Sequence, residues 1–225
     1  MIPPEFDAGF RARFEDLLRW RRDVRHFRPE PLPRATLERL LDLADLAPSV
    51  GLSQPWRFVI VDDLARRAAV RESFLRANAA ALAGLPAERA TLYARLKLAG
   101  LDQAPCQLAL FSLPDPEQGH GLGRATMALT LDYSAVMALH TLWLAARAEG
   151  IGLGWVSILE PEVVTAALDV PAGWRLIGYF CLGYPASVEA EPELQREGWE
   201  TRRPIPACPV DLSGCRFFQA AAVSW

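Results

Sequence analysis

Residues 131–149, with the sequence LDYSAVMALHTLWLAARAE, decide what kind of fold this chain forms. Apolar side chains fall on nearly every face of the helix predicted there: Val136, Leu139, Leu142, Trp143 and Leu144. Three polar residues interrupt the segment, Asp132, His140 and Arg147, so it is predicted to be a buried helix and not a membrane span. A chain of 225 residues has few other elements to cover such a helix. We therefore expect it to lie at the centre of a homodimer interface.

Outward from this segment, the pattern alternates between helices and short apolar strands. The expected strands are 56–61, 106–112, 154–158 and 175–182, and the expected helices are 5–21, 35–46, 64–83, 87–101 and 161–168. This order predicts an α+β fold with a central mixed sheet flanked by helices, in an intertwined homodimer. We expect one domain over 1–225, with a helical excursion at 64–101 and an irregular tail at 185–225.

Composition excludes several classes of protein. The net charge is −3, which gives no basic field for nucleic acid. No apolar segment suited to secretion or membrane insertion stands near the N-terminus. No C-x-x-C or other metal-ligand spacing is present, which predicts no metal site and reduced thiols in the cytoplasm. The four cysteines are Cys106, Cys181, Cys208 and Cys215.

The segment Arg21-Arg22-Asp23-Val24-Arg25 places three guanidinium groups around one carboxylate. Guanidinium forks hold a phosphate monoester bidentately, so phosphate binding is favoured over surface ion pairing, which contributes little. Asp23 would compete with such an anion, which indicates a role of its own. The alternative is a salt bridge at a helix end with Arg22 or Arg25.

A second segment, 47–56 (APSVGLSQPW), is a loop that exposes its backbone before an apolar strand. Ser49 and Gln54 are its candidate ligand contacts. Two glycine-rich segments, 119–123 and 150–154, lack the strand before and helix after that a dinucleotide-binding motif needs. No NAD(P)H domain is therefore expected.

Five segments together, 21–25, 47–56, 142–150, 152–157 and 181–185, resemble the nitroreductase-like flavoproteins over 18–203. Asp23 stands where ordinary nitroreductases usually carry serine, and the segment Gly154-Trp155-Val156-Ser157 also differs from theirs. These residues make the chain similar to the branch of flavin destructases, which consume their own flavin.

The resemblance implies FMN at a subunit interface, contacted by both chains. It implies oxygen-dependent fragmentation of reduced FMN to 5,6-dimethylbenzimidazole and erythrose 4-phosphate, for the lower ligand of cobalamin. Dioxygen would be the co-substrate, and a separate NAD(P)H–flavin reductase would supply reduced FMN. The alternatives are an FMN-dependent NAD(P)H nitro- or quinone reductase, and a flavin-binding module without catalysis.

The same resemblance assigns site residues. The essential acid of the family falls on Asp23 and its essential serine on Ser157, although a hydroxyl closing a strand end is the plain alternative for Ser157. Cofactor contacts are implied for Arg21, Arg22, Arg25, Ser49, Gln54, Gly154 and Trp155, and for Arg202 or Arg203 at the phosphate.

Physical chemistry agrees with an acid–base role for Asp23. A carboxylate in a desolvated site is a suitable general base, and Ser157 can donate a hydrogen bond to the flavin. The neighbouring arginines would lower the pKa of Asp23 while burial would raise it, and the sequence leaves the balance open. Tyr93 and Lys97 share a helical face in the excursion and look either onto the site, as a lid, or into solvent.

Overall fold

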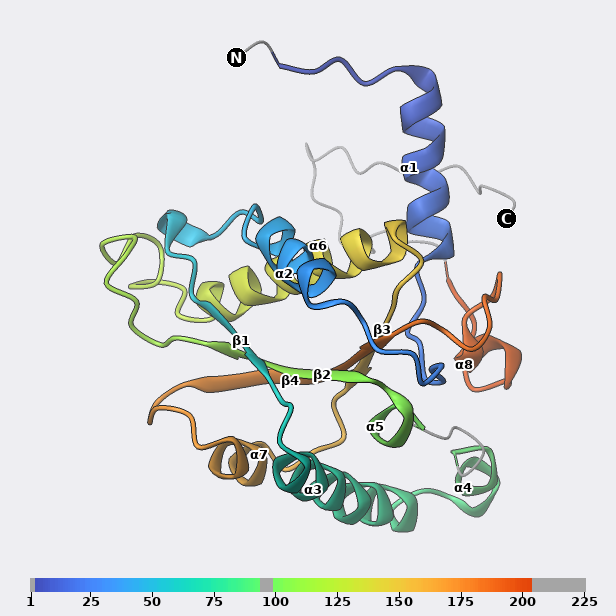
Figure 1. The fold of residues 1–225 in the computed structure, drawn as a ribbon. Helices are drawn as coiled ribbons and strands as arrows, with labels where there is room; N and C mark the ends of the chain where they lie inside the picture. Colours follow the sequence, from blue (N-terminus) through green and yellow to red (C-terminus); the bar gives the residue numbers. More distant parts are fainter. Residues whose placement is uncertain (1–2, 94–98, 204–225) are drawn as a thin grey trace, which may run out of the picture.

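Four strands form a single sheet in the order β1-β2-β4-β3 (Figure 1). The strands are β1 (Trp56–Ile60), β2 (Cys106–Ser112), β3 (Gly152–Val156) and β4 (Arg175–Gly183). The computed structural model describes residues 3–93 and 99–203. The sheet is therefore built from the four strands that the hydrophobic pattern predicted, with small shifts at their ends.

The neighbouring strands all pair antiparallel, so the mixed sheet expected from the sequence is wrong for these four strands. For β1 and β2 the reason lies in the helical excursion, which leaves and re-enters the sheet at the same end. The N–H of Val61, just after β1, donates to the carbonyl oxygen of Gln107 in β2 at 2.8 Å. A chain that returns at the end where it left must run back antiparallel. The parallel contact found in the described part of the chain is an isolated bridge between Asp23 and Leu153.

Two layers of helices enclose the sheet (Figure 1). Helices α2 (Arg34–Ala44) and α6 (Thr130–Ala148) cover one face, and α3 (Leu64–Ala83) and α7 (Pro161–Leu168) cover the other. Every residue of β2 is buried because this strand lies inside the sheet with helices on both faces. The remaining helices are α1 (Ala8–Trp20), α4 (Ala87–Tyr93), α5 (Gly100–Gln103) and α8 (Glu193–Arg196), with a short 3₁₀ turn, η1 (Val50–Leu52).

Helix α6 is buried on one side only. Leu139 and Leu142 are in the core, whereas Tyr133, Val136 and Met137 are 53%, 37% and 47% exposed. Among residues 3–93 and 99–203, the apolar side chains of this helix are therefore covered on one flank and exposed on the other. This observation supports the expected homodimer, which stays a prediction.

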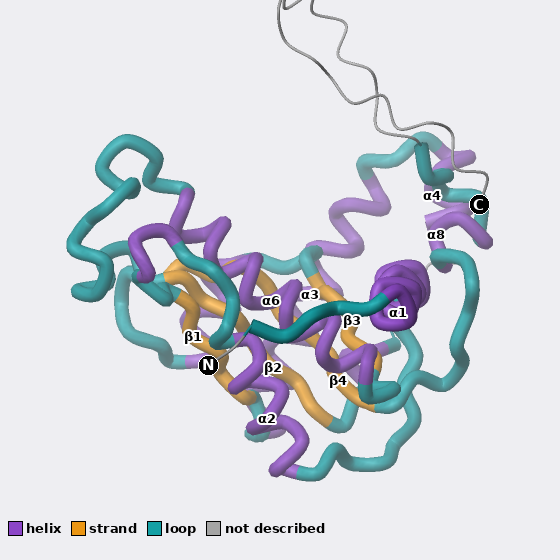
Figure 2. Tube along the Cα trace, turned by 90° about the horizontal axis from the view of Figure 1, so that it is seen from above, coloured by secondary structure: helices purple, strands orange, loops and turns teal. Residues whose placement is uncertain are grey.

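Helix α1 projects from the body of the molecule (Figures 1 and 2). Asp7 caps it by accepting from the N–H of Phe10 at 2.6 Å. The apolar face predicted for this helix is present, and its rings stack on one another at 4.6 and 6.3 Å between centroids. Its members are exposed in the single chain: Phe6, Phe10, Phe14 and Leu18.

Two predicted segments are described in part. Within the helix expected over 87–101, the structure describes α4 and α5, while Lys97 lies outside the described residues. The tail expected to be irregular contains the short helix α8. Cys208 and Cys215 also lie outside the described residues.

Candidate active site

Asp23 lies in the segment between α1 and α2, which runs beside the free edge of β3 and pairs with it at Leu153. The N–H of Val24 donates to the carbonyl oxygen of Leu153 at 3.0 Å, and Oδ1 of Asp23 accepts from the N–H of Trp155 at 2.8 Å. The two segments approach very closely, because a Cβ on Gly154 would lie 2.0 Å from the carbonyl oxygen of Val24. Only glycine permits this approach, so Gly154 places Asp23 beside Trp155.

The charge of Asp23 is set by opposing effects. Burial raises the pKa of the carboxyl, and the hydrogen bond from the Trp155 N–H, the Arg25 guanidinium and the Arg21 charge act against it; burial is the largest effect, and the pKa is raised. Nε of Arg25 lies 3.4 Å from Oδ2 of Asp23, whose side chain is still 38% exposed. The balance left open by the sequence is thus decided by burial, which moves this acid toward the range useful for proton transfer.

The exposed side of Asp23 faces a cavity that is open to solvent. Segment 20–26, the C-terminal part of α6, the start of β3 and segment 185–196 line it. Its charged lining residues come from three of these elements: Arg22, Asp23, Arg25, Arg147, Glu189, Glu191, Glu193 and Arg196. Four carboxylates and four guanidinium groups therefore share one opening to solvent.

Several guanidinium groups crowd together next to this cavity. Burial, followed by the charge of Arg202, lowers the pKa of Arg21, whose guanidinium lies 5.0 Å from the ring centre of Trp143. Burial, then the charges of Arg202, Arg21 and Arg147, lowers the pKa of Arg22. Mutual repulsion of this kind is relieved by a multiply charged anion, so the cluster is suited to a phosphate group.

Arg22 contributes a further feature that suits an anion. Its terminal nitrogens donate to backbone carbonyl oxygens, including that of Ala190, whereas its Nε is buried without a hydrogen-bond partner. A buried N–H without an acceptor is costly unless a ligand supplies one.

Arg202 and Arg203, which the sequence could not separate, differ in their surroundings. Arg202 lies near enough to Arg21 and Arg22 to lower the pKa of both. Both side chains are exposed, but Arg203 pairs with Glu200 at 3.4 Å. Arg147 was not identified as a site residue from the sequence. The available signal was its spacing of one helical turn from Trp143, which puts both side chains on the same face of α6.

Arg25 differs from the other arginines because carboxylates already balance its charge. It contacts Asp23 and lies 3.9 Å from Glu193, and its side chain is only 12% exposed. Its guanidinium therefore holds Asp23 in place and links it to α8.

Ser49 and Gln54 lie in a separate part of the chain, by η1 and the start of β1. Oγ of Ser49 accepts from the N–H of Gln54 at 3.1 Å, and Oε1 of Gln54 accepts from Nε2 of Gln118 at 2.9 Å. The loop is strained, since Leu52 and Gln54 have φ angles of 55° and 41°. One chain does not bring these residues to the cavity of Asp23.

Ser157 follows directly after β3 and is exposed, and it does not line the cavity. The alternation of side chains along a strand puts it on the same side as Trp155. Within one chain, Asp23 lies beside β3 and Ser157 follows it, but the two residues expected to be catalytic do not share one cavity.

The helical excursion contacts the C-terminal segment through α4. The hydroxyl of Tyr93 donates to Asn78 at 2.8 Å, and the ring of Trp199 lies 6.0 Å from that of Tyr93 and 5.3 Å from the Arg89 guanidinium. Tyr93 thus faces the segment that carries Arg202, which supports the lid prediction without testing it.

Across residues 3–93 and 99–203, no helix combines the length and the apolar character needed to cross a membrane. The same described ranges hold no cluster of three or more metal-binding side chains.

Comparisons with known proteins agree with this architecture. The Nitroreductase family profile matches residues 18–184. The chain is 60% identical over 203 residues to the 5,6-dimethylbenzimidazole synthase of Rhodospirillum rubrum, covering 90% of this chain and 96% of that protein. It is 50% identical over 199 residues to the enzyme of that name from Rhodobacter capsulatus, covering 88% and 96%.

Solved structures share the fold at low identity. Oxidized iodotyrosine deiodinase bound to FMN and 3-iodo-L-tyrosine has a TM-score of 0.69 and 22% identity, covering 87% of this chain and 98% of that one. A nitroreductase family protein from Clostridium novyi NT has a TM-score of 0.59 and 17% identity, covering 76% and 84%. The profile match, the identity to two full-length relatives and the shared fold show that this chain belongs to the nitroreductase family.

Proposed function

We propose that this protein is a 5,6-dimethylbenzimidazole synthase. It would fragment reduced FMN with dioxygen to 5,6-dimethylbenzimidazole and erythrose 4-phosphate, the former serving as the lower ligand of cobalamin. The sequence identity of 60% to the Rhodospirillum rubrum protein supports the activity. The structural observation that carries the proposal is the partly buried carboxyl of Asp23, of raised pKa, beside a cluster of arginines at one cavity.

The residues present fit the phosphate group of FMN. Arg21, Arg22 and Arg202 repel one another, and Nε of Arg22 has no acceptor. A phosphate monoester would relieve both conditions, and Arg147 would add a fourth positive charge. A TM-score of 0.69 to a structure containing FMN shows the same fold and is consistent with this use of it.

The chemistry divides between the flavin and the protein. Reduced FMN would supply the electrons for oxygen and the carbon skeleton that is cut. Asp23 would accept a proton from the ribityl chain, since its raised pKa favours proton uptake over that of an ordinary aspartate. Arg25 and the Trp155 N–H hold the carboxylate in a single orientation. Ser157 would donate one hydrogen bond to the flavin.

Two chains would complete the site. Ser49 and Gln54 lie apart from Asp23 in a single chain, and the exposed face of α6 offers a surface for a second copy. In a homodimer, the loop 47–56 of one subunit would close over the flavin held by the arginines of the other. A separate NAD(P)H–flavin reductase and a cytoplasmic location belong to this proposal.

Turnover with flavin reduced by a second enzyme tests the activity. The purified protein is mixed with FMN, an independent NADPH–flavin reductase keeps the flavin reduced, air is admitted, and the products are separated by chromatography. We expect dimethylbenzimidazole and loss of flavin. Oxidation of NAD(P)H by the protein alone, with a nitro or quinone acceptor and with FMN conserved, would instead identify an ordinary reductase. Bound FMN without either reaction would identify a binding module.

A further inference from the structure

The connection that carries Ser157 is held at its far end by α3. Residues 157–160 join β3 to α7, and Glu160 stands just before the first turn of α7. The side chain of Glu160 does not cap this helix, and Pro161 at its first position has no N–H. The start of α7 is therefore positioned by contacts from outside the helix.

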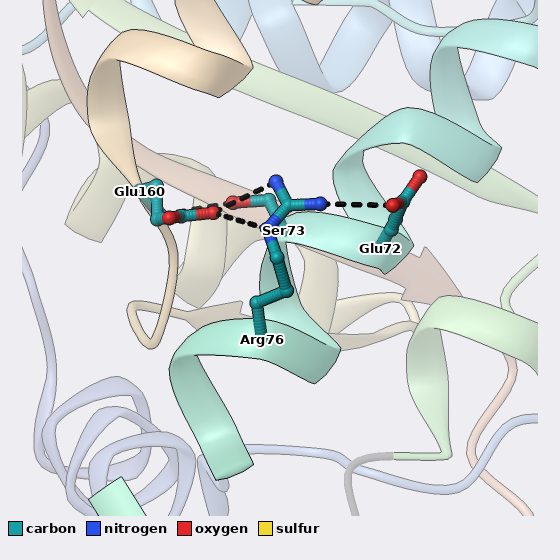
Figure 3. A network of polar contacts seen from close by, with 4 residues as sticks. All are labelled: Glu72, Ser73, Arg76 and Glu160. Atoms are coloured by element: carbon teal, nitrogen blue, oxygen red, sulfur yellow. Dashed lines mark hydrogen bonds and ion pairs between the residues drawn. The ribbon is translucent and has the colours of Figure 1, made fainter. Parts of the chain in front are cut away.

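Ser73 and Arg76, which are neighbours on one face of α3, make those contacts (Figure 3). The N–H of Glu160 donates to Oγ of Ser73 at 2.9 Å, and Ser73 is fully buried. Arg76 donates to Oε2 of Glu160 from Nε at 3.0 Å and from Nη2 at 2.8 Å, while its Nη1 donates to Glu72 at 2.9 Å. Because both the backbone and the carboxylate of Glu160 are held, its position and direction are fixed together.

Helix α3 contacts the opposite end of α7 as well. Arg66 donates to the carbonyl oxygen of Leu168 and lies 4.0 Å from Asp169. The two helices thus run antiparallel with a polar contact at each end. Only the contact at Glu160 adjoins the connection that holds Ser157, three residues away.

We propose that Ser73 and Arg76 are positioning residues that hold the Ser157 hydroxyl at the flavin site through the backbone of Glu160. The inference rests on the proposed function, because it assumes that Ser157 takes part in the reaction. A connection this short passes a displacement of Glu160 on to Ser157. Misplacement by about 1 Å is enough to lower a catalysed rate on the order of 100-fold. Neither residue lines the cavity beside the arginine cluster, so we expect them to affect the position of Ser157 and not the binding of the FMN phosphate.

The test compares Ser73→Ala and Arg76→Gln with Arg66→Gln, which removes the polar contact at the other end of the same helix pair. Turnover of reduced FMN and thermal unfolding are measured for each. We expect Ser73→Ala and Arg76→Gln to lower kcat about tenfold or more at unchanged KM for reduced FMN. Arg66→Gln should lower the unfolding temperature about as much as Arg76→Gln does. It should, however, leave kcat within about twofold of the parent. Arg76→Lys, which keeps the charge but not the fork, should restore part of the rate.

A double-mutant cycle with Ser157→Ala separates a positioning role from general damage to the fold. Its readout is the rate of product formation in a single turnover. Ser73→Ala should have no further effect on the residual rate of Ser157→Ala. Equal losses from Arg66→Gln and Ser73→Ala, or losses that multiply with Ser157→Ala, would overturn the inference. A wild-type kcat in Arg76→Gln would also overturn the inference. Because Arg76 is exposed, this variant should fold even if Ser73→Ala does not. The parent protein reports separately on the proposed function, which fails if the parent forms no benzimidazole.

Discussion

Asp23 shows how one residue acquires its chemistry from neighbours far along the chain. The Trp155 N–H, Arg25 and Arg21 all favour the charged carboxylate, yet burial outweighs them and raises the pKa. A raised pKa in the folded protein means that the ionised form opposes folding. Function and stability therefore make opposite demands at this position.

Replacing Asp23 with asparagine keeps its size and its ability to accept from the Trp155 N–H. We expect Asp23→Asn to bind FMN and to lose at least about 100-fold in dimethylbenzimidazole formation, the range for removal of a general base. The rate of the parent should fall as pH drops through a pKa above the usual value for aspartate. Benzimidazole formation by Asp23→Asn at the parental rate would show that the carboxylate is not the base.

The same variant predicts a change in stability with a defined sign. Since the folded state binds the proton of Asp23 more tightly than the unfolded state, the contribution of this group to stability is full at low pH and is lost as pH rises through the raised pKa. Asp23→Asn should therefore unfold at a higher temperature than the parent at pH 7. The gap should narrow as pH falls, and a gap that widens in acid would contradict the raised pKa.

Arg202 and Arg203 form a matched pair for testing the phosphate site. Arg202 adds its charge to the cluster around Arg21, while Arg203 pairs with Glu200. We expect Arg202→Gln to weaken FMN binding about 10- to 100-fold, the range for a charge-assisted hydrogen bond, and Arg203→Gln to leave it unchanged. Fluorescence titration of FMN measures both. If Arg203→Gln weakened FMN binding and Arg202→Gln did not, the phosphate contact would belong to Arg203.

Among the secondary-structure elements, the edge of β3 is the one on which the site depends. Asp23 and Val24 pair with this edge, and the pairing brings Asp23 and Arg25 to the cavity. Glycine at 152 and 154 makes the pairing possible, because larger residues would collide with Val24. The motif Gly-Leu-Gly-Trp is thus a packing device as well as a candidate cofactor contact.

A methyl group at Gly154 tests that packing. Gly154→Ala would place Cβ 2.0 Å from a backbone oxygen, and we expect a loss of about 1–3 kcal/mol in the free energy of unfolding together with weaker FMN binding. Gly84→Ala is the control, since its Cβ would meet ordinary contacts of 3.6 Å or more at the end of α3. Chemical denaturation measures both variants. Equal stability of the two would remove the argument for close approach.

For the whole molecule, the separation of its two groups of candidate residues is the main feature. Asp23 and the arginines lie by the edge of β3, while Ser49 and Gln54 lie by β1, at the opposite edge of the sheet. The exposed flank of α6 runs between these regions in the fold (Figure 1). A second copy covering that flank would give the apolar residues a partner and join the two half-sites.

A charge on the exposed flank of α6 tests this arrangement. We expect Met137→Glu to convert a dimer into a monomer and to abolish FMN binding, because a carboxylate buried in an apolar interface lacks a partner. Leu64→Glu on α3, which alters a residue 77% exposed on another face, is the control and should leave both unchanged. Light scattering after gel filtration gives the mass. A monomeric parent that binds FMN would refute the shared site.

Local chemistry made much of this protein predictable from its sequence. Runs of apolar residues located the four strands that the structure describes. Four residues of the Arg-Arg-Asp-Val-Arg segment, 22–25, line the cavity together, because adjacent residues stay together in any fold. The resemblance of several such segments was sufficient for the family.

Tertiary structure alone decided the rest, since it depends on residues that are distant in sequence. The antiparallel pairing of β1 with β2 follows from where the excursion re-enters the sheet, and the raised pKa of Asp23 follows from its partial burial beside the edge of β3. Arg147 joins the arginine cluster only because α6 ends beside segment 21–22. The contact of Ser73 and Arg76 with Glu160 spans more than 80 residues of chain, and no local pattern encodes such a meeting.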